Sequence, residues 1–176
     1  TVFDVNGVGP IRGMWSYGSR LYVVSGTQLY DNGTLRGTIA GTGPVSMSDN
    51  GIQLFIATST GTSYIWNNAT LVLAQIVDAD FVGAVTVGYL DGFFVFAPTA
   101  GIGQQVWVTS LLDGTSVNPP DFASAEASPD GVMAVAVVHD ELWVFGTHTT
   151  EVWYNAGTAG FPFAPIQGAF MEVGCV

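Results

Sequence analysis

Lysine is absent from this 176-residue chain, and its only arginines are Arg12, Arg20 and Arg36. Asp and Glu together number 14, which gives a formal net charge of −11 at pH 7. A protein that grips nucleic acid needs several Lys or Arg side chains to displace the counterions of the phosphate backbone. The composition therefore argues against tight nucleic-acid binding, whereas an acidic surface would let DNA pass without sticking.

Cysteine and long apolar runs are equally scarce. Cys175 is the only cysteine, so an internal disulfide is excluded. The longest apolar stretches, such as Val132–Val138, fall far short of the roughly 18 residues that cross a bilayer as a helix. The first ten residues lack the cationic start and the apolar run of a signal peptide. We expect no membrane insertion, and we expect a chain that opens on TVFDVNG to come from inside a longer protein.

Motifs for catalysis or for holding a cofactor are missing too. His139 and His148 are the only histidines, which is too few for a zinc site, and the glycine clusters lack the context of a phosphate-binding loop. No G-x-S-x-G segment offers a nucleophilic serine. The carboxylate pairs that a glycosidase could use are Asp78 with Asp80, Asp121 with Glu126, and Asp140 with Glu141. Turns explain each pair better, so the sequence predicts no catalytic residue, no metal, no cofactor and no enzyme activity.

What the chain does have is a couplet that recurs four times, in which two apolar runs flank a short turn. The copies are Arg20–Gly33, Gln53–Asn67, Phe93–Val108 and Glu141–Asn155. They start about 33, 40 and 48 residues apart, which is the period of propeller blades. β-branched and aromatic residues dominate the runs, and Gly, Asn, Asp and Ser separate them. The pattern predicts an all-β chain that forms a β-propeller, with about four four-stranded blades in an incomplete ring.

The couplets also set the expected blade boundaries. We expect blades at approximately residues 8–40, 41–80, 81–127 and 128–170 of one propeller domain, and the start of a further blade at 171–176. The second strand of each blade is apolar on both faces, which suits a strand between two neighbouring blades. An outer-membrane barrel would instead alternate over about ten positions, so we rank that architecture lower. The largest interruption, Leu111–Gly131, is predicted to be a long loop.

Two places in the sequence are candidate interfaces. The long loop carries Asp121, Phe122 and Glu126, and long loops on a rigid scaffold often carry contacts. Trp153 and Tyr154 are the best candidates for an exposed aromatic pair. The five tryptophans could line a platform for a sugar, although packing between blades is the default explanation for them. The alternative function is therefore a carbohydrate-binding or glycan-hydrolysing propeller that acts at a host surface.

A group of segments provides a more specific signal. The clearest are DFASAE, the PDG turn, ELWVFG, TTEVWYN and FPFAPIQGAFMEVGC, at Asp121–Glu126, Pro129–Gly131, Glu141–Gly146, Thr149–Asn155 and Phe161–Cys175. Arg12–Tyr30 and Gly41–Thr58 fit the same family. Together these segments resemble the packaged-DNA stabilisation family, the tail hub or nozzle proteins of short-tailed bacteriophages. The resemblance spans nearly the whole chain but covers only about the front half of a family member.

The resemblance implies a structural virion protein of a phage tail, made in the cytoplasm of the host bacterium. Such subunits form a homo-oligomeric ring below the head–tail connector, where they extend the DNA exit channel and help to seal it. The ring would also dock distal tail parts such as tailspikes, tail fibres and a plug. Genomic DNA would pass without being held tightly. The family has no catalytic residues to transfer to this chain.

Overall fold

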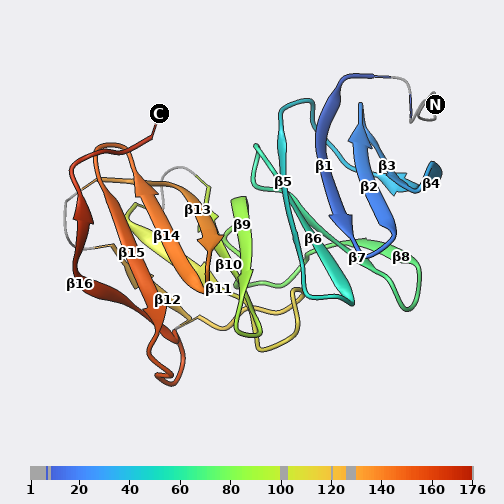
Figure 1. Cartoon of the computed structure of the whole chain (residues 1–176). Helices are drawn as coiled ribbons and strands as arrows, with labels where there is room; N and C mark the ends of the chain where they lie inside the picture. The colour runs from blue at the N-terminus through green and yellow to red at the C-terminus, as the bar shows by residue number, and fades with distance from the viewer. Residues whose placement is uncertain (1–6, 8, 100–102, 120, 126–129, 176) are drawn as a thin grey trace.

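The chain folds into four antiparallel sheets that stand side by side in an open arc (Figure 1). The computed structural model describes residues 7, 9–99, 103–119, 121–125 and 130–175. Within these residues there are sixteen strands and no helix. Each sheet has four strands in simple sequence order, as in the blades of a β-propeller, and the ring is not closed. The predicted fold class is confirmed.

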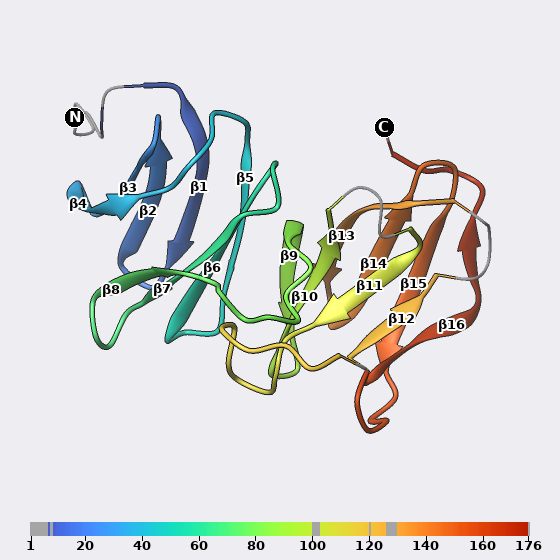
Figure 2. The ribbon, with the colours of Figure 1, turned by 180° about the vertical axis from the view of Figure 1, so that it is seen from behind.

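The blades follow one another along the chain, and their inner strands β1, β5, β9 and β13 run in the same direction (Figures 1 and 2). Blades 1 and 2 consist of β1 (Ile11–Tyr17), β2 (Arg20–Ser25), β3 (Gln28–Asp31), β4 (Thr34–Thr38), β5 (Val45–Asp49), β6 (Gln53–Thr58), β7 (Ser63–Asn67) and β8 (Val72–Gln75). Blades 3 and 4 consist of β9 (Ala84–Leu90), β10 (Phe93–Pro98), β11 (Gln105–Val108), β12 (Phe122–Ser124), β13 (Val132–Val138), β14 (Glu141–Gly146), β15 (Thr150–Asn155) and β16 (Phe163–Met171).

Among the described residues, those that follow Met171 do not belong to a strand. Met171 ends β16 and pairs with Thr150 of β15. The described residues 172–175 have no strand geometry. The backbone N–H of Cys175 donates to the carbonyl of Gly146, 2.9 Å away, so the chain runs back over blade 4 at this point.

The hairpin between the first two strands of each blade depends on residues that tolerate a left-handed backbone. Asp91 and Gly92 connect β9 to β10 with φ values of 49° and 93°. His139 and Asp140 connect β13 to β14 with φ values of 49° and 63°, although neither is glycine. Two residues with positive φ form the tight turn that matches the twist of paired strands. Because the four inner strands run in the same direction, their hairpins all lie at the same edge of the arc, which we call the turn edge (Figure 1).

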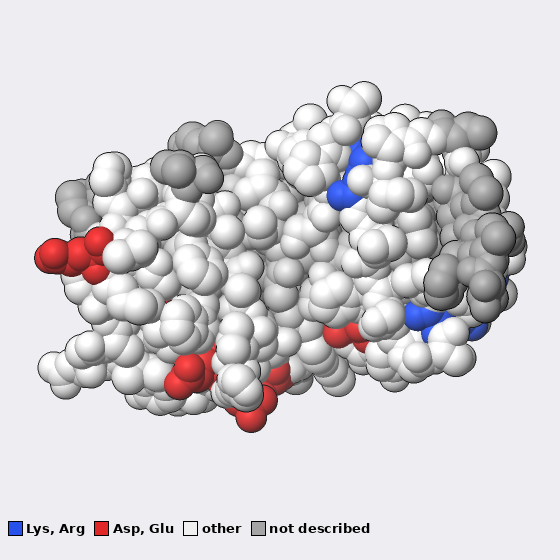
Figure 3. All heavy atoms as spheres, turned by 45° about the horizontal axis from the view of Figure 1, so that its top comes forward, with Lys and Arg blue, Asp and Glu red and all other residues white. Residues whose placement is uncertain are grey.

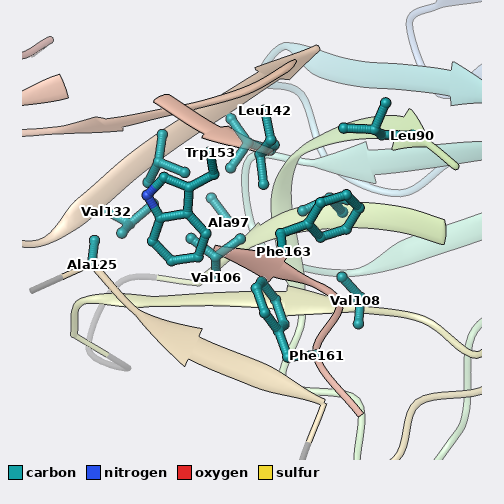
Figure 4. Packing of buried hydrophobic residues seen from close by; sticks show 13 residues of the cluster. Leu90, Ala97, Val106, Val108, Ala125, Val132, Leu142, Trp153, Phe161 and Phe163 are labelled. Carbon is teal, nitrogen blue, oxygen red and sulfur yellow. The ribbon is translucent and has the colours of Figure 1, made fainter. Parts of the chain in front are cut away.

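The core lies between the blades, in three clusters that each fill one junction. Leu29, Leu54 and Trp66 belong to the cluster between blades 1 and 2. Phe55 and Phe94 belong to the cluster between blades 2 and 3, with ring centroids 5.5 Å apart. The third cluster packs β10 and β11 against β14, β15 and the start of β16 (Figure 4). Because the middle strands bury residues on both faces, the centre of the second strand of each blade is a continuous apolar run, as in the repeated couplets.

Candidate functional site

The three arginines all lie in blade 1, and none of them is free to bind an anion. Arg20 Nη1 lies 2.7 Å from Asp31 Oδ2, and Arg36 Nη2 lies 3.1 Å from the same oxygen. Arg36 also packs over the ring of Trp66, with 5.3 Å between its Cζ and the ring centroid. Asp31 is buried, and its single carboxylate pairs with both guanidinium groups.

The third arginine, Arg12, is buried and has no carboxylate among its hydrogen-bond partners. Its guanidinium donates to four backbone carbonyls, those of Gly26, Ile39, Ala40 and Gly43, at distances of 2.6 to 3.0 Å. Burial lowers the pKa of Arg12 from its usual value, yet an arginine keeps its proton in a protein. Its charge is therefore used to hold together the β2–β3 turn and the link from blade 1 to blade 2.

The turn edge carries acidic side chains of three successive blades. Asp49, Asp91 and Asp140 lie at the first hairpin turns of blades 2, 3 and 4. Burial, together with the nearby charges of Asp49 and Asp91, raises the pKa of Tyr89. In Figure 3, Asp and Glu gather along the lower margin and the left end, whereas the few cationic atoms lie on the right half, which blades 1 and 2 form. The surface charge outside blade 1 is thus entirely negative.

A loop from blade 3 crosses this edge and is fastened to blade 2. Gln53 donates to Asp113 Oδ1 over 3.2 Å and accepts the N–H of Gly114 over 2.8 Å, while Asn50 Nδ2 lies 3.3 Å from the carbonyl of Leu112. Burial raises the pKa of Asp113, but hydrogen bonds from Thr115 and Gln53 outweigh it and leave the pKa below its usual value. These bonds hold residues 112–115 against blade 2, so this part of the predicted long loop belongs to the turn edge.

The fastened loop presents apolar side chains to solvent. Leu111 and Leu112 are each 61% exposed, and Ile52 in the adjacent hairpin is 59% exposed. Leu112 has a φ of 60°, which is uncommon for a bulky residue, and its N–H donates to the carbonyl of Gly92. Exposed leucines on a rigid loop favour contact with another protein surface.

The predicted interface residues of the long loop lie mostly inside the protein. Asp121 is 7% exposed and accepts a hydrogen bond of 2.9 Å from Asn118. Phe122 stacks on Trp107 with ring centroids 4.9 Å apart. Glu126 lies outside the described residues. In this structure Asp121 and Phe122 therefore anchor the return of the loop to β12.

The predicted exposed aromatic pair is wrong for one of its two members. Trp153 is 1% exposed and donates to Glu151 Oε2 over 2.8 Å, whereas Tyr154 is 47% exposed. Four consecutive residues of β15 are buried, which removes the alternation that would reveal the inward face in the sequence. Trp66 and Trp107 are buried as well, so a tryptophan platform for a sugar does not form from these side chains.

The side of the arc that faces the propeller axis is hollowed. A hollow of about 460 Å³ runs along all four inner strands, past Trp15, Asp49, Tyr89 and Val135. A second hollow, of about 580 Å³, lies at the edge opposite the turn edge and is lined by uncharged residues such as Val85 and Met133.

No group of three or more His, Cys, Asp and Glu in the described ranges could hold a metal ion. No helix among the described residues is long and apolar enough to cross a membrane.

Several solved structures share this fold at low sequence identity. YCF48 bound to a D1 peptide aligns with a TM-score of 0.63 and 10% identity, over 94% of this chain and 56% of that one. The computationally designed Ika4 protein aligns with a TM-score of 0.59 and 12% identity, over 85% of this chain and 94% of that one. PorZ, a surface component of the type-IX secretion system of Porphyromonas gingivalis, aligns with a TM-score of 0.54 and 11% identity, over 93% and 21%. These similarities show the fold alone.

Sequence comparison is more specific about the family. No curated protein is significantly similar to the chain. The family described as bacteriophage P22 Gp10, beta-propeller, matches residues 2–176, which is nearly every residue of the chain. This match agrees with the four blades, with the open ring and with the resemblance of the short segments. The chain belongs to the bacteriophage P22 Gp10 β-propeller family.

Proposed function

We propose that the protein is a structural, non-enzymatic component of a phage tail. In this role it forms part of a ring below the head–tail connector, extends the DNA exit channel and helps to seal it. Membership of a bacteriophage propeller family supports a role in the virion. The ring, its place in the tail and its partners are the parts that the proposal adds.

The observation that carries the proposal is that every arginine is bonded to a carboxylate or to backbone carbonyls of the protein itself. Arg20 and Arg36 share Asp31, and Arg12 donates to four carbonyls. The chain has no lysine, and its net charge is −11. Retention of DNA requires free cations that displace counterions from phosphate groups. A surface without them allows a genome to slide through a channel quickly in either direction.

The turn edge is the surface that we propose for docking distal tail parts. It carries the exposed Leu111, Leu112 and Ile52 on segments that hydrogen bonds hold in place. A rigid apolar surface loses little conformational freedom when a partner binds. The acidic turns around it would favour a partner surface with positive charge.

The decisive experiment uses the phage that encodes the chain. A stop codon in the gene should yield heads that package DNA but lose it, measured as a fall in nuclease-protected DNA per particle. Cryo-electron microscopy of wild-type virions should show the propeller in a ring directly below the connector. A protein located in the head shell or at the tips of fibres, or mutant particles with full DNA retention, would refute the proposal.

A further inference from the structure

One tripeptide, Asp-Asn-Gly, occurs twice in the chain, and the fold places its two copies in different surroundings. The copies are Asp31–Gly33, where β3 turns into β4, and Asp49–Gly51, where β5 turns into β6. An asparagine that precedes glycine can be attacked by the glycine nitrogen, because glycine has no Cβ to hinder the approach. This attack begins the conversion of the side-chain amide into a carboxylate. The sequence alone gives the two asparagines the same reactivity, so any difference between them comes from the fold.

In the second copy a carboxylate is held against the attacking nitrogen. Asp49 Oδ1 accepts the N–H of Gly51 over 2.8 Å. The other carboxylate oxygen, Oδ2, accepts the indole N–H of Trp15 over 2.6 Å, which fixes the carboxylate in this position. A carboxylate within hydrogen-bond reach of the proton that must be removed is placed to act as a general base.

The side chain that is attacked, Asn50, is also held in a suitable way. Its Oδ1 accepts the N–H of Ile52 over 3.0 Å and that of Gln53 over 2.7 Å. Attack on Cγ places negative charge on this oxygen, and N–H donors that are already in position stabilise such charge. The departing Nδ2 is held less closely, at 3.3 Å from the carbonyl of Leu112 and 3.5 Å from Gln53 Oε1. Ile52 is 59% exposed, so the turn is open to water.

The same side chains are engaged differently in the first copy. Asp31 is buried, and its Oδ2 lies 2.7 and 3.1 Å from the guanidinium groups of Arg20 and Arg36. The Asn32 side chain is held by the hairpin between β1 and β2, since its Oδ1 accepts the N–H of Leu21 over 2.8 Å and its Nδ2 donates to a carbonyl of that turn over 3.1 Å. The carboxylate is therefore occupied by cations, and the amide is tied to another hairpin.

We propose that Asn50 is a site of spontaneous deamidation that the fold promotes, with Asp49 as the general base. The nitrogen of Gly51 attacks Asn50 Cγ and forms a new C–N bond. The proton of this nitrogen passes to Asp49 and from there to the side-chain amide, which leaves as ammonia. The product is a succinimide ring. Water then opens the ring at either carbonyl, which yields aspartate or isoaspartate at position 50.

The modification changes the fastened loop of the turn edge. The amide that donates to the carbonyl of Leu112 is lost, and a new negative charge joins Asp49 and Asp113 at this edge. Isoaspartate also adds a methylene group to the backbone of the turn, and turn geometry sets the register of the paired strands. Amide hydrogen exchange of residues 112–115 should therefore become faster as the modification accumulates.

The inference concerns the chemistry of one turn and does not depend on the place of the protein in a virion. Peptide mass spectrometry of protein incubated at neutral pH measures both asparagines in one sample, and water labelled with heavy oxygen marks the new carboxylates. In the folded protein, Asn50 should deamidate on the order of 100-fold faster than Asn32, as general acid–base catalysis typically provides. In urea the two copies lose their different surroundings, so their rates should be similar, and Asn50 should react more slowly than in the folded protein. Equal rates in the folded protein, or an Asn50 that unfolding accelerates, would overturn the proposal.

Substitution of the base tests its role directly. Asp49→Asn keeps an oxygen that can accept the Gly51 N–H but removes the proton acceptor, so it should slow the reaction of Asn50 on the order of 100-fold and leave Asn32 unchanged. Asp140→Asn makes the same change in the equivalent turn of blade 4 and should have no effect on Asn50.

A second variant keeps the test valid if Asp49→Asn disturbs folding. Trp15→Phe retains the carboxylate but frees its Oδ2, so the base is less well positioned and Asn50 should react several-fold more slowly, on the order of 10-fold at most. Circular dichroism verifies that the β-sheet signal is retained. An Asn50 rate that neither variant lowers would refute the role of Asp49.

Discussion

At the scale of single residues, Arg12 is one of only three arginines in the chain, and it stabilises the fold from a buried position. Four carbonyls from the β2–β3 turn and the link between blades converge on its guanidinium. Replacement by methionine would leave these carbonyls without a donor in a buried place. We predict that Arg12→Met lowers the free energy of unfolding by about 3 kcal/mol, the usual cost of losing a buried charged partner. Urea denaturation monitored by tryptophan fluorescence measures this loss.

Arg20→Met is the matched control for Arg12→Met. The Arg20 side chain is 35% exposed, and Arg36 would remain beside Asp31 after the substitution. Because solvent screens the partly exposed Arg20 and because Arg36 still pairs with the buried Asp31, the control should cost about 1 kcal/mol or less. Equal losses for the two variants would contradict the assigned role of Arg12.

At the scale of elements, the fastened loop segment 109–119 leads to a prediction about pH. Asp113 accepts hydrogen bonds from Thr115 N, Thr115 Oγ1 and Gln53 Nε2 at 2.9, 2.7 and 3.2 Å. These bonds depress its pKa in the folded state, so their contribution is present above the unfolded pKa of about 3.9 and is lost as the pH falls through the folded value. We predict that Asp113→Asn costs about 1–2 kcal/mol at pH 7 and progressively less as the solution is acidified from about pH 4.

The measurement is the unfolding free energy of the wild type and of Asp113→Asn across this pH range. Ile52→Ser, an uncharged change beside the loop, should follow the pH dependence of the wild type. Amide hydrogen exchange of residues 109–118 gives a local readout, because loss of the Gln53 contacts should speed exchange there first. A cost of Asp113→Asn that stays constant between pH 7 and pH 3 would contradict the prediction.

The elements were more predictable than the surfaces they present. Each couplet predicted the two middle strands of a blade, because strands buried on both faces carry runs of consecutive apolar residues. The same burial removes any alternation, so the sequence could not show that Trp153 points into the core while Tyr154 points out. The role of Arg12 was equally hidden, since its four acceptors come from segments 14 to 31 residues away. The sequence could not predict the exposure of candidate site residues where that exposure depends on how one blade packs against the next.

At the scale of the whole molecule, the protein separates its charges. All cations belong to blade 1 and are held by its own carboxylate or by carbonyls, whereas the turn edge is acidic and apolar. Net charge of one sign acts over several ångströms in physiological salt and repels a polyanion before any contact forms. The absence of free cations is therefore a property of the entire surface and not of one site.

The consequence can be tested by adding cations to the turn edge. We predict that the wild type shows no binding to a 20-base-pair duplex in fluorescence anisotropy at about 50 mM salt, because no free cation releases counterions. The triple variant Ser19→Lys, Ile52→Lys and Leu111→Lys places three cations along this edge and should acquire weak binding. That binding should weaken with salt, with a slope of about −0.9 for each phosphate contacted. The glutamine triple variant at the same positions controls for lost apolar surface and should not bind; salt-dependent binding by the wild type would refute the account.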